Sequence, residues 1–598
     1  MPDNNGVEYT SPPQSRNEAI LADTLNGVEY TDPAQSRIEA LLKMLNALII
    51  SGGGSPNVIN LKSLGAAGDG TTDDSDAVKD AFDLAAETGM PLYIPEGIYL
   101  VKWGQIITTL TEKGIRIFGD GKFKSIIKME TSHTTSAAGN YGNGVILMNR
   151  DDSSIAPDIS MSDIGITWDG DENVAVTHQS RLLGMYGYFG EVFIEDCYLH
   201  LGGVDGHMPP DTCFFPQLGA DIISIKNCLI ENFTNNKLGG GIWIVTDDKI
   251  SEEETAHHKI RQAIVRDNVF KTSNEDEALA LYPSRTNATP TECFKDVLID
   301  GNVITHKNWL DPTADCYPTN GLLTVFIEEA SAPVVDANIV ISNNTIDDYY
   351  AHQEPIRTSG FTGVDICNNN IRVRKTSLVP DTQTPANSPT LKILYFDRVA
   401  KGVVRDNVFD FTDITDIECR AVVQATAEAL WKNNVIKTGY NFRIAPSNTS
   451  NTGGVLTFEG NTVYPLNNSK FIIYKSGVNT KLFVYKNTVY GNTNLNNLWG
   501  ENFIIKGNHF NAGTGTDNTY DLPNTSASGA IDYQMNDGLT IRLNDSSIQT
   551  KISKFKYMGK KKNLVFRVGG AVVEDSAEVR ALFFASTANT EIVYLGTE

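Results

Sequence analysis

Basic residues are scarce in this chain of 598 residues, in which 49 Lys and Arg face 73 Asp and Glu for a formal net charge of −24. Nucleic acids and anionic membranes are bound through basic surfaces that replace their counterions, so we expect neither as the main partner. No run approaches the ~18 consecutive apolar residues of a transmembrane helix, so we expect no membrane insertion. The opening MPDNNGVEYT is acidic and lacks the apolar core of a secretory signal, which predicts synthesis in a cytoplasm.

Cysteine is also scarce. Seven cysteines form no Cys-x-x-Cys pair, and an odd, scattered set fits neither a disulfide framework nor a zinc site. Buried thiols that pack as small apolar side chains are the better interpretation. The pair His257 and His258 follows SEEETA and is more typical of a loop than of a metal site. We therefore expect no metal and no cofactor. The cysteines are Cys197, Cys213, Cys228, Cys293, Cys316, Cys367 and Cys419.

Asparagine and glycine are abundant instead, with 52 and 50 residues. Both favour turns. Hydrophobic residues make up 41% of the chain, which is enough apolar material for a large core and argues against global disorder. The composition predicts a folded chain that contains many turns.

A duplicated segment opens the chain. Residues 5–21 and 26–42 both begin with NGVEYT and are identical at 13 of 17 positions. A copy this short cannot hold a core, so we interpret it as an attachment peptide. The second copy continues into a helical pattern that predicts either a two-heptad coiled-coil seam or one amphipathic helix docked on its own chain. The apolar positions of that pattern are Ile38, Leu41, Leu45 and Leu48.

From residue 58 the sequence predicts a strand, a turn rich in Gly and Asp, and a short helix. Ser75 can cap the N-terminus of this helix, Asp76 lies in its first turn, and Gly89 can end it. The stretch GAAGDGTTDDSDAVKDAF followed by LYIPEGIY is similar to the opening of the pectate-lyase-like right-handed parallel β-helix superfamily. That resemblance implies that the helix covers the N-terminal end of a solenoid.

A six-residue unit, apolar-x-(Asp/Asn/Gly/Lys)-Asn-x-apolar, recurs through the middle of the chain at intervals of 21 to 42 residues. A fixed local motif with elastic spacing is typical of a coiled sheet with loops inserted on some turns. Inward Asn side chains on successive coils would lie about 4.8 Å apart and could hydrogen-bond along the stack. The fourth position is occupied by Cys197, Cys228, Asn268, Asn302, Asn344, Asn369, Asn407, Asn434, Asn461, Asn487 and Asn508.

We therefore predict an all-β chain: a right-handed single-stranded parallel β-helix with an N-terminal capping helix, a short N-terminal helical adaptor and a small C-terminal β domain. The adaptor comprises residues 1–54, the cap 55–130, the β-helix 131–522 and the C-terminal domain 523–598. The last boundary is placed where the Asn units stop and strands such as LTIRLND and NLVFRVGG begin. Six Lys between residues 551 and 562 are typical of a guarded edge strand or hairpin, with a polyanion-binding patch as the alternative.

This order of adaptor, linker, capped β-helix and C-terminal β domain resembles bacteriophage tailspikes. The resemblance implies a homotrimeric receptor-binding protein of the virion that attaches to the phage tail through residues 1–54. It also implies that the β-helix binds a bacterial surface polysaccharide and depolymerises it by glycoside hydrolysis or by β-elimination. A polysaccharide lyase of the same fold, a glycan-binding adhesin without activity and a free-standing bacterial carbohydrate enzyme are the alternatives.

Geometry selects the candidate catalytic residues, because the chain lacks the paired-Asp and HG motifs of polygalacturonases. Glycoside hydrolysis needs two carboxyls, about 6.5–9.5 Å apart for inversion, and equivalent positions two coils apart are about 9.6 Å apart. Acids at the ends of the strands that lie between the Asn units satisfy this spacing, and so do acids at the starts of those strands. The first set is Asp247, Glu328, Glu329 and Asp397; the second is Glu277 and Glu354, with Asp276 beside Glu277.

Aromatic side chains in the same strands could stack on sugar rings, although core packing is the alternative for each. They are Trp243, Tyr282 and Tyr395, and Arg357 and Asp397 complete the predicted substrate-binding set. A lyase would need a base near a uronic acid, for which Lys237, His207, Tyr282 and Arg357 are the candidates.

Overall fold

The computed structural model of the protein describes residues 57–596, apart from internal segments that are given at the end of this paragraph. The predicted adaptor, residues 1–54, lies outside the described residues. The segments left out are 103–105, 131–143, 150–155, 170–180, 203–211, 234–239, 247–258, 274–276, 283–292, 308–320, 328–333, 350–353, 375–389, 416–417, 425–427, 448–453, 467–468, 476–480, 499–502, 512–518, 522–529, 537, 539, 546–550 and 553.

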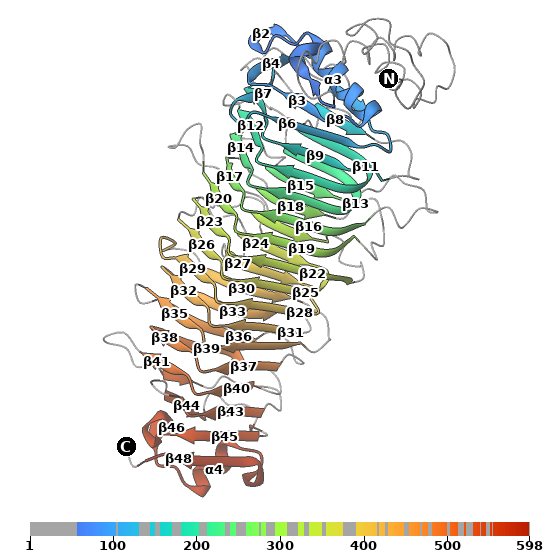
Figure 1. Cartoon of the computed structure of the whole chain (residues 1–598). Coiled ribbons are helices and arrows are strands. Elements are labelled where there is room, and N and C mark those ends of the chain that lie inside the picture. The colour runs from blue at the N-terminus through green and yellow to red at the C-terminus, as the bar shows by residue number, and fades with distance from the viewer. Residues whose placement is uncertain are drawn as a thin grey trace, which may run out of the picture.

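The strands form three parallel stacks, which we call stack 1, stack 2 and stack 3 in the order in which each coil passes through them. Stacks 1 and 2 belong to one 29-stranded sheet, because the long strands β11 (Arg181–Glu195) and β13 (Thr212–Lys226) run through both, and stack 3 is a 15-stranded sheet. Successive coils lie side by side along an elongated rod (Figure 1). The predicted parallel β-helix is confirmed.

Short strands separated by turns or by connecting segments make up each stack. Besides β11 and β13, stack 1 contains β5 (Ile106–Thr109), β8 (Gly144–Asn149), β15 (Ile242–Val245), β18 (Leu279–Tyr282), β21 (Leu323–Phe326), β24 (Ile356–Ser359), β27 (Thr390–Asp397), β30 (Glu418–Gln424), β33 (Phe442–Ser447), β36 (Lys470–Lys475) and β39 (Asn492–Leu498).

Stack 2 extends furthest toward the C-terminal end of the rod. It contains β1 (Ile59–Asn60), β3 (Leu92–Ile94), β6 (Ile115–Gly119), β9 (Ile159–Ser162), β16 (Ile260–Arg266), β19 (Phe294–Asp300), β22 (Val335–Ser342), β25 (Phe361–Cys367), β28 (Lys401–Arg405), β31 (Glu428–Lys432), β34 (Val455–Glu459), β37 (Lys481–Tyr485), β40 (Phe503–Lys506), β43 (Ala530–Gln534), β45 (Lys554–Gly559) and β48 (Thr590–Tyr594).

Stack 3 follows the tight turn after stack 2. It contains β2 (Asp69–Asp73), β4 (Gly97–Val101), β7 (Ser125–Met129), β10 (Gly165–Asp169), β12 (Tyr198–Gly202), β14 (Leu229–Phe233), β17 (Val269–Thr272), β20 (Val303–His306), β23 (Thr345–Asp348), β26 (Asn370–Val373), β29 (Val408–Phe411), β32 (Val435–Thr438), β35 (Thr462–Pro465), β38 (Thr488–Tyr490) and β41 (His509–Asn511).

A helix covers the N-terminal end of the rod, where Figure 1 shows α3 (Ser75–Thr88) in blue beside the first strands. It buries one apolar face, and Gly89, at φ 71°, ends it by donating its N–H to Ala85 O. The predicted N-cap is wrong by one residue, because Asp74 is the N-cap and Ser75 is the first helical residue. The Asp74 carboxylate accepts from the backbone N–H groups of Ala67 and Gly68, so it fixes the preceding turn instead of the helix. The 3-10 helix η1 (Leu61–Leu64) precedes this turn.

An asparagine ladder lines the turn between stacks 2 and 3. The residue before each ladder position has a positive φ, as Asp267 (56°) and Asp406 (59°) illustrate. From Asn302 onward each ladder Asn accepts, through Oδ1, from the backbone N–H and the Nδ2 of the previous rung, as in the 3.0 Å bonds from Asn268 to Asn302. The predicted ladder is confirmed from Asn268 to Asn508, and Asn536 adds one rung. At the other end Cys228 donates its N–H to Asn268.

The C-terminal end continues the rod. Strands β43, β45 and β48 stack in parallel on β40, so residues 530–594 are further coils and not a separate domain. Strand β45 is paired on both sides, so the prediction that its lysines guard an edge strand is wrong.

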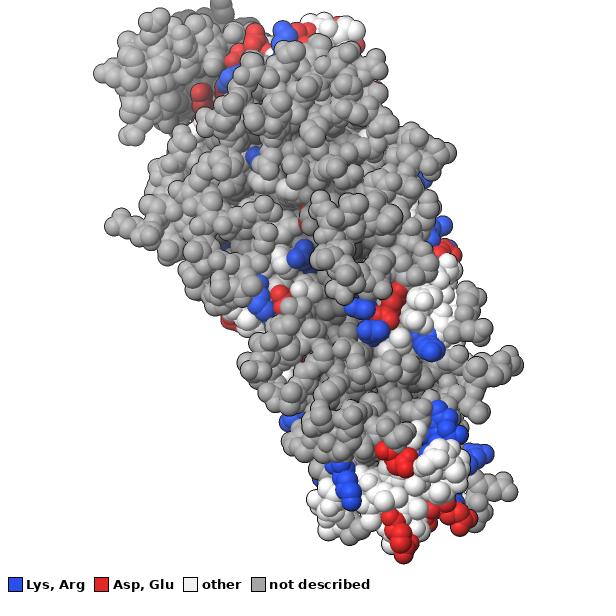
Figure 2. Space-filling model, turned by 180° about the vertical axis from the view of Figure 1, so that it is seen from behind, with Lys and Arg blue, Asp and Glu red and all other residues white. Residues whose placement is uncertain are grey.

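A four-stranded sheet also lies at the C-terminal end. It consists of β42 (Thr519–Asp521), β44 (Thr540–Asn544), β46 (Leu564–Val568) and β47 (Ala571–Val573), and the short helices there are α4 (Ala577–Phe583), η3 (Lys561–Asn563) and η4 (Thr587–Asn589). At its lower end, Figure 2 shows an uncharged surface on the C-terminal end of the rod, with basic and acidic side chains around it.

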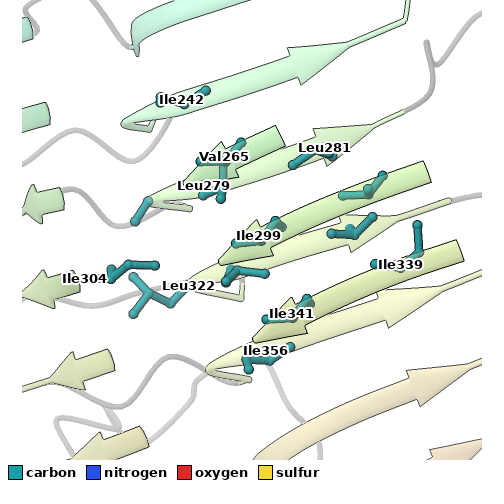
Figure 3. Close-up of a cluster of buried hydrophobic side chains, with 14 of the residues drawn as sticks. Ile242, Val265, Leu279, Leu281, Ile299, Ile304, Leu322, Ile339, Ile341 and Ile356 are labelled. Carbon is teal, nitrogen blue, oxygen red and sulfur yellow. The ribbon is translucent and has the colours of Figure 1, made fainter. Parts of the chain in front are cut away.

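The core is made of aliphatic side chains at equivalent positions of successive coils. Ile242, Leu279 and Ile356 lie along stack 1, while Val265, Ile299 and Ile341 lie along stack 2, and all are fully buried (Figure 3). Six cysteines are buried and free, which confirms their predicted role as small apolar side chains, and Cys316 lies outside the described residues. In the described part of the chain, no helix is long and apolar enough to cross a membrane.

Candidate functional site on the outer face of stack 1

Two outward columns of side chains run along stack 1 from β13 to β27. In β15 the alternation is clear, since Ile242 and Ile244 are buried whereas Trp243 and Val245 are partly exposed. The first column is rich in aromatic and cationic side chains; it consists of Phe215, Trp243, Ala280, Thr324, Arg357 and Tyr395. The second contains Val245, Tyr282, Phe326, Ser359 and Asp397. Sequence periodicity in four-residue strands thus brings these residues to one face.

Two buried glutamates lie just before the strands of this face. Glu277 is 1% exposed and Glu354 is 2% exposed. Leu279, Leu323 and Ile356 occupy equivalent positions of β18, β21 and β24, so Glu277, Gly321 and Glu354, each two residues earlier, are equivalent as well. Glu277 and Glu354 are therefore two coils apart, with Gly321 on the coil between them. At about 4.8 Å per coil their backbones are about 9.6 Å apart. Acidic side chains are rarely this buried without a specific role, so the pair is a candidate for acid–base chemistry.

Glu277 is held by its own coil. The Tyr282 hydroxyl donates to Glu277 Oε1, and the side chain of Ala280, which lies between them in the strand, is a single methyl group. The Tyr282 ring meets the Trp243 indole edge to face at 6.3 Å. A Cβ at Gly240 would collide with the Glu277 carbonyl oxygen and with Trp243 Nε1, so the indole rests directly on a glycine backbone.

Arg357 joins the aromatic side chains of the next coils. Its guanidinium carbon lies 3.7 Å from the ring centre of Phe326 and 5.7 Å from that of Tyr395, both within cation–π range. Burial and the Asp397 charge raise the pKa of Tyr395 to about 12. Burial also raises the pKa of Asp397, although Arg398, 3.6 Å away, opposes this shift. In these coils the face therefore combines aromatic rings, the stacked Arg357 and three acidic side chains.

The structure places seven of the predicted site residues on this face. They are Trp243, Glu277, Tyr282, Glu354, Arg357, Tyr395 and Asp397, and their roles remain predictions. The predicted Asp247, Asp276, Glu328 and Glu329 lie outside the described residues, as do His207, Lys237, His257 and His258.

Sequence reasoning missed two aromatic members of the columns and one cation. Phe215 and Phe326 alternate with buried neighbours in CFF and TVF, and this alternation was the available signal. The Arg181 guanidinium carbon lies 3.5 Å from the Phe215 ring centre. Nothing in the sequence near Arg181 indicates this contact, since it joins neighbouring coils.

A second polar cluster lies on the outer face of stack 3. His200 Nδ1 lies 3.0 Å from Glu231 Oε2, and His200 Nε2 lies 3.1 Å from Asp169 Oδ1. Lys271 donates to Glu231 Oε1 at 2.9 Å. Burial lowers the pKa of His200, but hydrogen bonds to the two carboxylates outweigh it and raise the pKa to about 9. His200, Glu231 and Lys271 each lie three residues after a ladder position, so aligned repeats would have revealed them. The side chains of this cluster are hydrogen-bonded to one another, which indicates a structural role.

In the described ranges, no group of three or more His, Cys, Asp or Glu side chains is placed so that it could bind a metal ion.

A family model described as rhamnogalacturonase A/epimerase, pectate lyase-like, matches residues 58–171, which include the cap and the first coils. The fold of the described chain is a right-handed parallel β-helix. A curated relative, the non-secreted LysM effector LysM19 of Penicillium expansum, is 34% identical over 98 residues. The matched region covers 15% of this chain and only 7% of the length of that protein.

Solved structures to which this chain is similar include an enzyme module and a phage protein. The mannuronan C-5 epimerase AlgE4 A-module of Azotobacter vinelandii has 12% identity and a TM-score of 0.38, covering 75% of this chain and 99% of that one. The gp42 tailspike of Acinetobacter phage vb_AbaP_AS12 has 10% identity and a TM-score of 0.35, covering 91% of this chain and 67% of that one.

Proposed function

We propose that the protein binds a bacterial surface polysaccharide along the outer face of stack 1 and depolymerises it by glycoside hydrolysis. The observation that carries this proposal is the pair of buried glutamates, Glu277 and Glu354, two coils apart beside two columns that contain aromatic side chains. Aromatic rings bind the apolar faces of sugars, and paired carboxyls cleave glycosidic bonds.

The spacing of the pair predicts inversion. In an inverting hydrolase one carboxyl protonates the leaving glycosidic oxygen while the other takes a proton from the attacking water, at a separation of about 6.5–9.5 Å. We assign Glu277 as the base, because Tyr282 already orients its carboxylate, and Glu354 as the acid. The bond between the anomeric carbon and the glycosidic oxygen breaks as the water oxygen bonds to the opposite face of that carbon.

The side chains of the two columns beside Glu277 and Glu354 would bind the sugar chain. Trp243 and Tyr395 are partly exposed, and each can stack on one sugar ring. Arg357 lies between them along the first column and can donate hydrogen bonds to ring substituents. The net charge of −24 favours a neutral or weakly charged glycan over a polyanion at this face.

The wider role that we propose is that of a phage tailspike. The order of the chain supports it, with a duplicated attachment peptide in residues 1–54 followed by a capped rod. Such a protein would be a homotrimer on the virion and would act at the host cell surface. Light scattering of the purified protein should then give three times the chain mass of 65.4 kDa, and a mass of one chain would contradict the trimer.

Incubation with the purified polysaccharide of the host tests the activity. We expect new reducing ends from the wild type, and a loss of about 10²–10⁴-fold in kcat in Glu277→Gln and in Glu354→Gln. Glu428→Gln, which neutralises an exposed glutamate of β31, is the matched control and should keep full activity. Products with an unsaturated uronate would show a lyase, and glycan binding without any cleavage would show an adhesin. Either result overturns the hydrolase proposal.

A further inference from the structure

A cavity of about 370 Å³ lies at the C-terminal end of the rod, far along the chain from the face of stack 1. Its volume falls within the range of about 300–1,000 Å³ for small-ligand sites. Six of its lining residues carry the argument: Lys561, Lys562, Phe566, Val572, Glu574 and Tyr594. Together they offer two ammonium groups, an apolar surface, a carboxylate and a phenol.

The segment that supplies the two lysines of this cavity is basic within an acidic chain. Residues 551–573 contain six Lys, one Arg and no acidic residue, although the whole chain has a net charge of −24. Two acidic side chains nearby are neutralised, since Glu591 pairs with Lys556 at 3.1 Å and Asp575 pairs with Arg580 at 2.5 Å, whereas Glu574 adds its own carboxylate to the lining. Lys561 and Lys562 are both exposed at the cavity. An anionic group can therefore approach two lysines without local repulsion from these paired acids.

The walls of the cavity are held in place by polar contacts. Arg580 donates two hydrogen bonds to the Asp575 carboxylate, at 2.7 and 2.5 Å, and the Tyr594 hydroxyl donates a third at 2.5 Å. On the opposite side, β47 folds back antiparallel onto β46 through Gly569 and Gly570, whose φ values are 58° and 82°. This hairpin presents Val572, 66% exposed, at the cavity. The site is thus preorganised and needs no large movement to accept a ligand.

We propose that this cavity is a second carbohydrate-binding site, which takes an anionic sugar unit that carries a carboxylate or a phosphate. Lys561 and Lys562 would bind the anionic group, Val572 the apolar face of the ring, and Glu574 the hydroxyl groups. The site differs from the face of stack 1 in its charge preference. It would hold the end of the rod on an acidic polymer of the cell surface.

Calorimetric titration of the full-length protein tests the site. The probes are a galacturonate trisaccharide for the carboxylate, a hexose phosphate for the phosphate and a galactose trisaccharide as the neutral reference. We expect at least one anionic probe to bind and its affinity to fall at least tenfold in Lys561→Gln/Lys562→Gln. The matched control, Lys481→Gln/Lys554→Gln, removes two exposed lysines outside the cavity and should stay within twofold of the wild type.

A second variant keeps the test independent of the lysines. Val572→Asp places a carboxylate at a 66% exposed position and should abolish binding of the anionic probe without lowering the thermal unfolding midpoint. The proposal is overturned if no anionic probe binds at millimolar concentration, if the neutral trisaccharide binds as tightly, or if both double variants lose affinity equally. Binding of only one anionic probe supports the site and identifies its anion.

Discussion

Replacing Asn407 by alanine should destabilise the rod through its turn ladder. Asn407 is 1% exposed, and its Oδ1 accepts from the backbone N–H of Asn369 at 2.8 Å. Its Nδ2 donates to the Ile366 carbonyl at 2.8 Å. The alanine variant deprives both backbone groups of these bonds. The side chains of the adjacent rungs keep a second partner each, since Asn369 Nδ2 donates to Ile341 O and Asn434 Oδ1 accepts from Asn407 N.

The expected cost follows from these two losses. A buried donor left without its acceptor costs about 1–3 kcal/mol, and the lost bond to the carbonyl adds about 1 kcal/mol, so the free energy of unfolding should fall by about 2–4 kcal/mol. Urea unfolding followed by tryptophan fluorescence measures the change. Hydrogen exchange of the Asn369 amide measures it locally, with about a tenfold faster exchange for each 1.4 kcal/mol.

Asn370→Ala is the matched control, because Asn370 directly follows Asn369, the rung that bonds to Asn407, and its side chain is exposed on β26. Its unfolding midpoint should stay close to that of the wild type, as for most exposed substitutions. Equal midpoints for the two variants, together with an Asn369 amide that remains protected in Asn407→Ala, would refute the reasoning that the ladder stabilises the turns.

Three further predictions concern other parts of the rod. Because the carboxylates around His200 raise its pKa to about 9, from an ordinary value of 6.5, the wild type should exceed His200→Gln in urea midpoint below pH 6.5. That advantage should disappear as the pH rises through 9, and a constant difference would contradict it. Gly240→Ala should displace the Trp243 indole and weaken oligosaccharide affinity at least tenfold in calorimetry; an unchanged affinity would show that the indole does not bind sugar. Burial raises the pKa of Cys293 to about 12, and six thiols are buried. An aromatic disulfide reagent should therefore titrate at most one of the seven thiols before unfolding, and rapid reaction of several would contradict their burial.

The ladder shows how much of this fold can be predicted from a local motif. The six-residue unit predicted every Asn rung from Asn268 to Asn508, since each needs the same turn with a positive φ before it. Asn536 was missed because Met535 occupies the preceding position, at φ 52°, and Gly538 replaces the last apolar residue of the unit. Tertiary stacking holds Met535 in a conformation that a long side chain rarely adopts.

The candidate site was less predictable than the fold. Periodicity within strands placed Trp243 and Tyr282 on one face, because a period of two needs no long-range information. The stacking of Arg357 on Phe326 depends on which coils are neighbours and on their register, and the varying loop lengths hide both from the sequence. The bond between Tyr282 and Glu277 lies within one coil, but it depends on side-chain positions that the strand pattern does not give. The C-terminal boundary was wrong for a similar reason: the Asn units stop, but aliphatic and aromatic side chains continue the same stack in β45 and β48.

The most direct test of the central claim is a crystal structure of Glu277→Gln with an oligosaccharide of the host polymer. We expect the sugar chain to lie along stack 1, with one ring on Trp243 and a glycosidic oxygen within hydrogen-bond distance of the Glu354 carboxyl. A sugar chain bound on another face, with Glu277 and Glu354 remote from it, would contradict the assignment of this site.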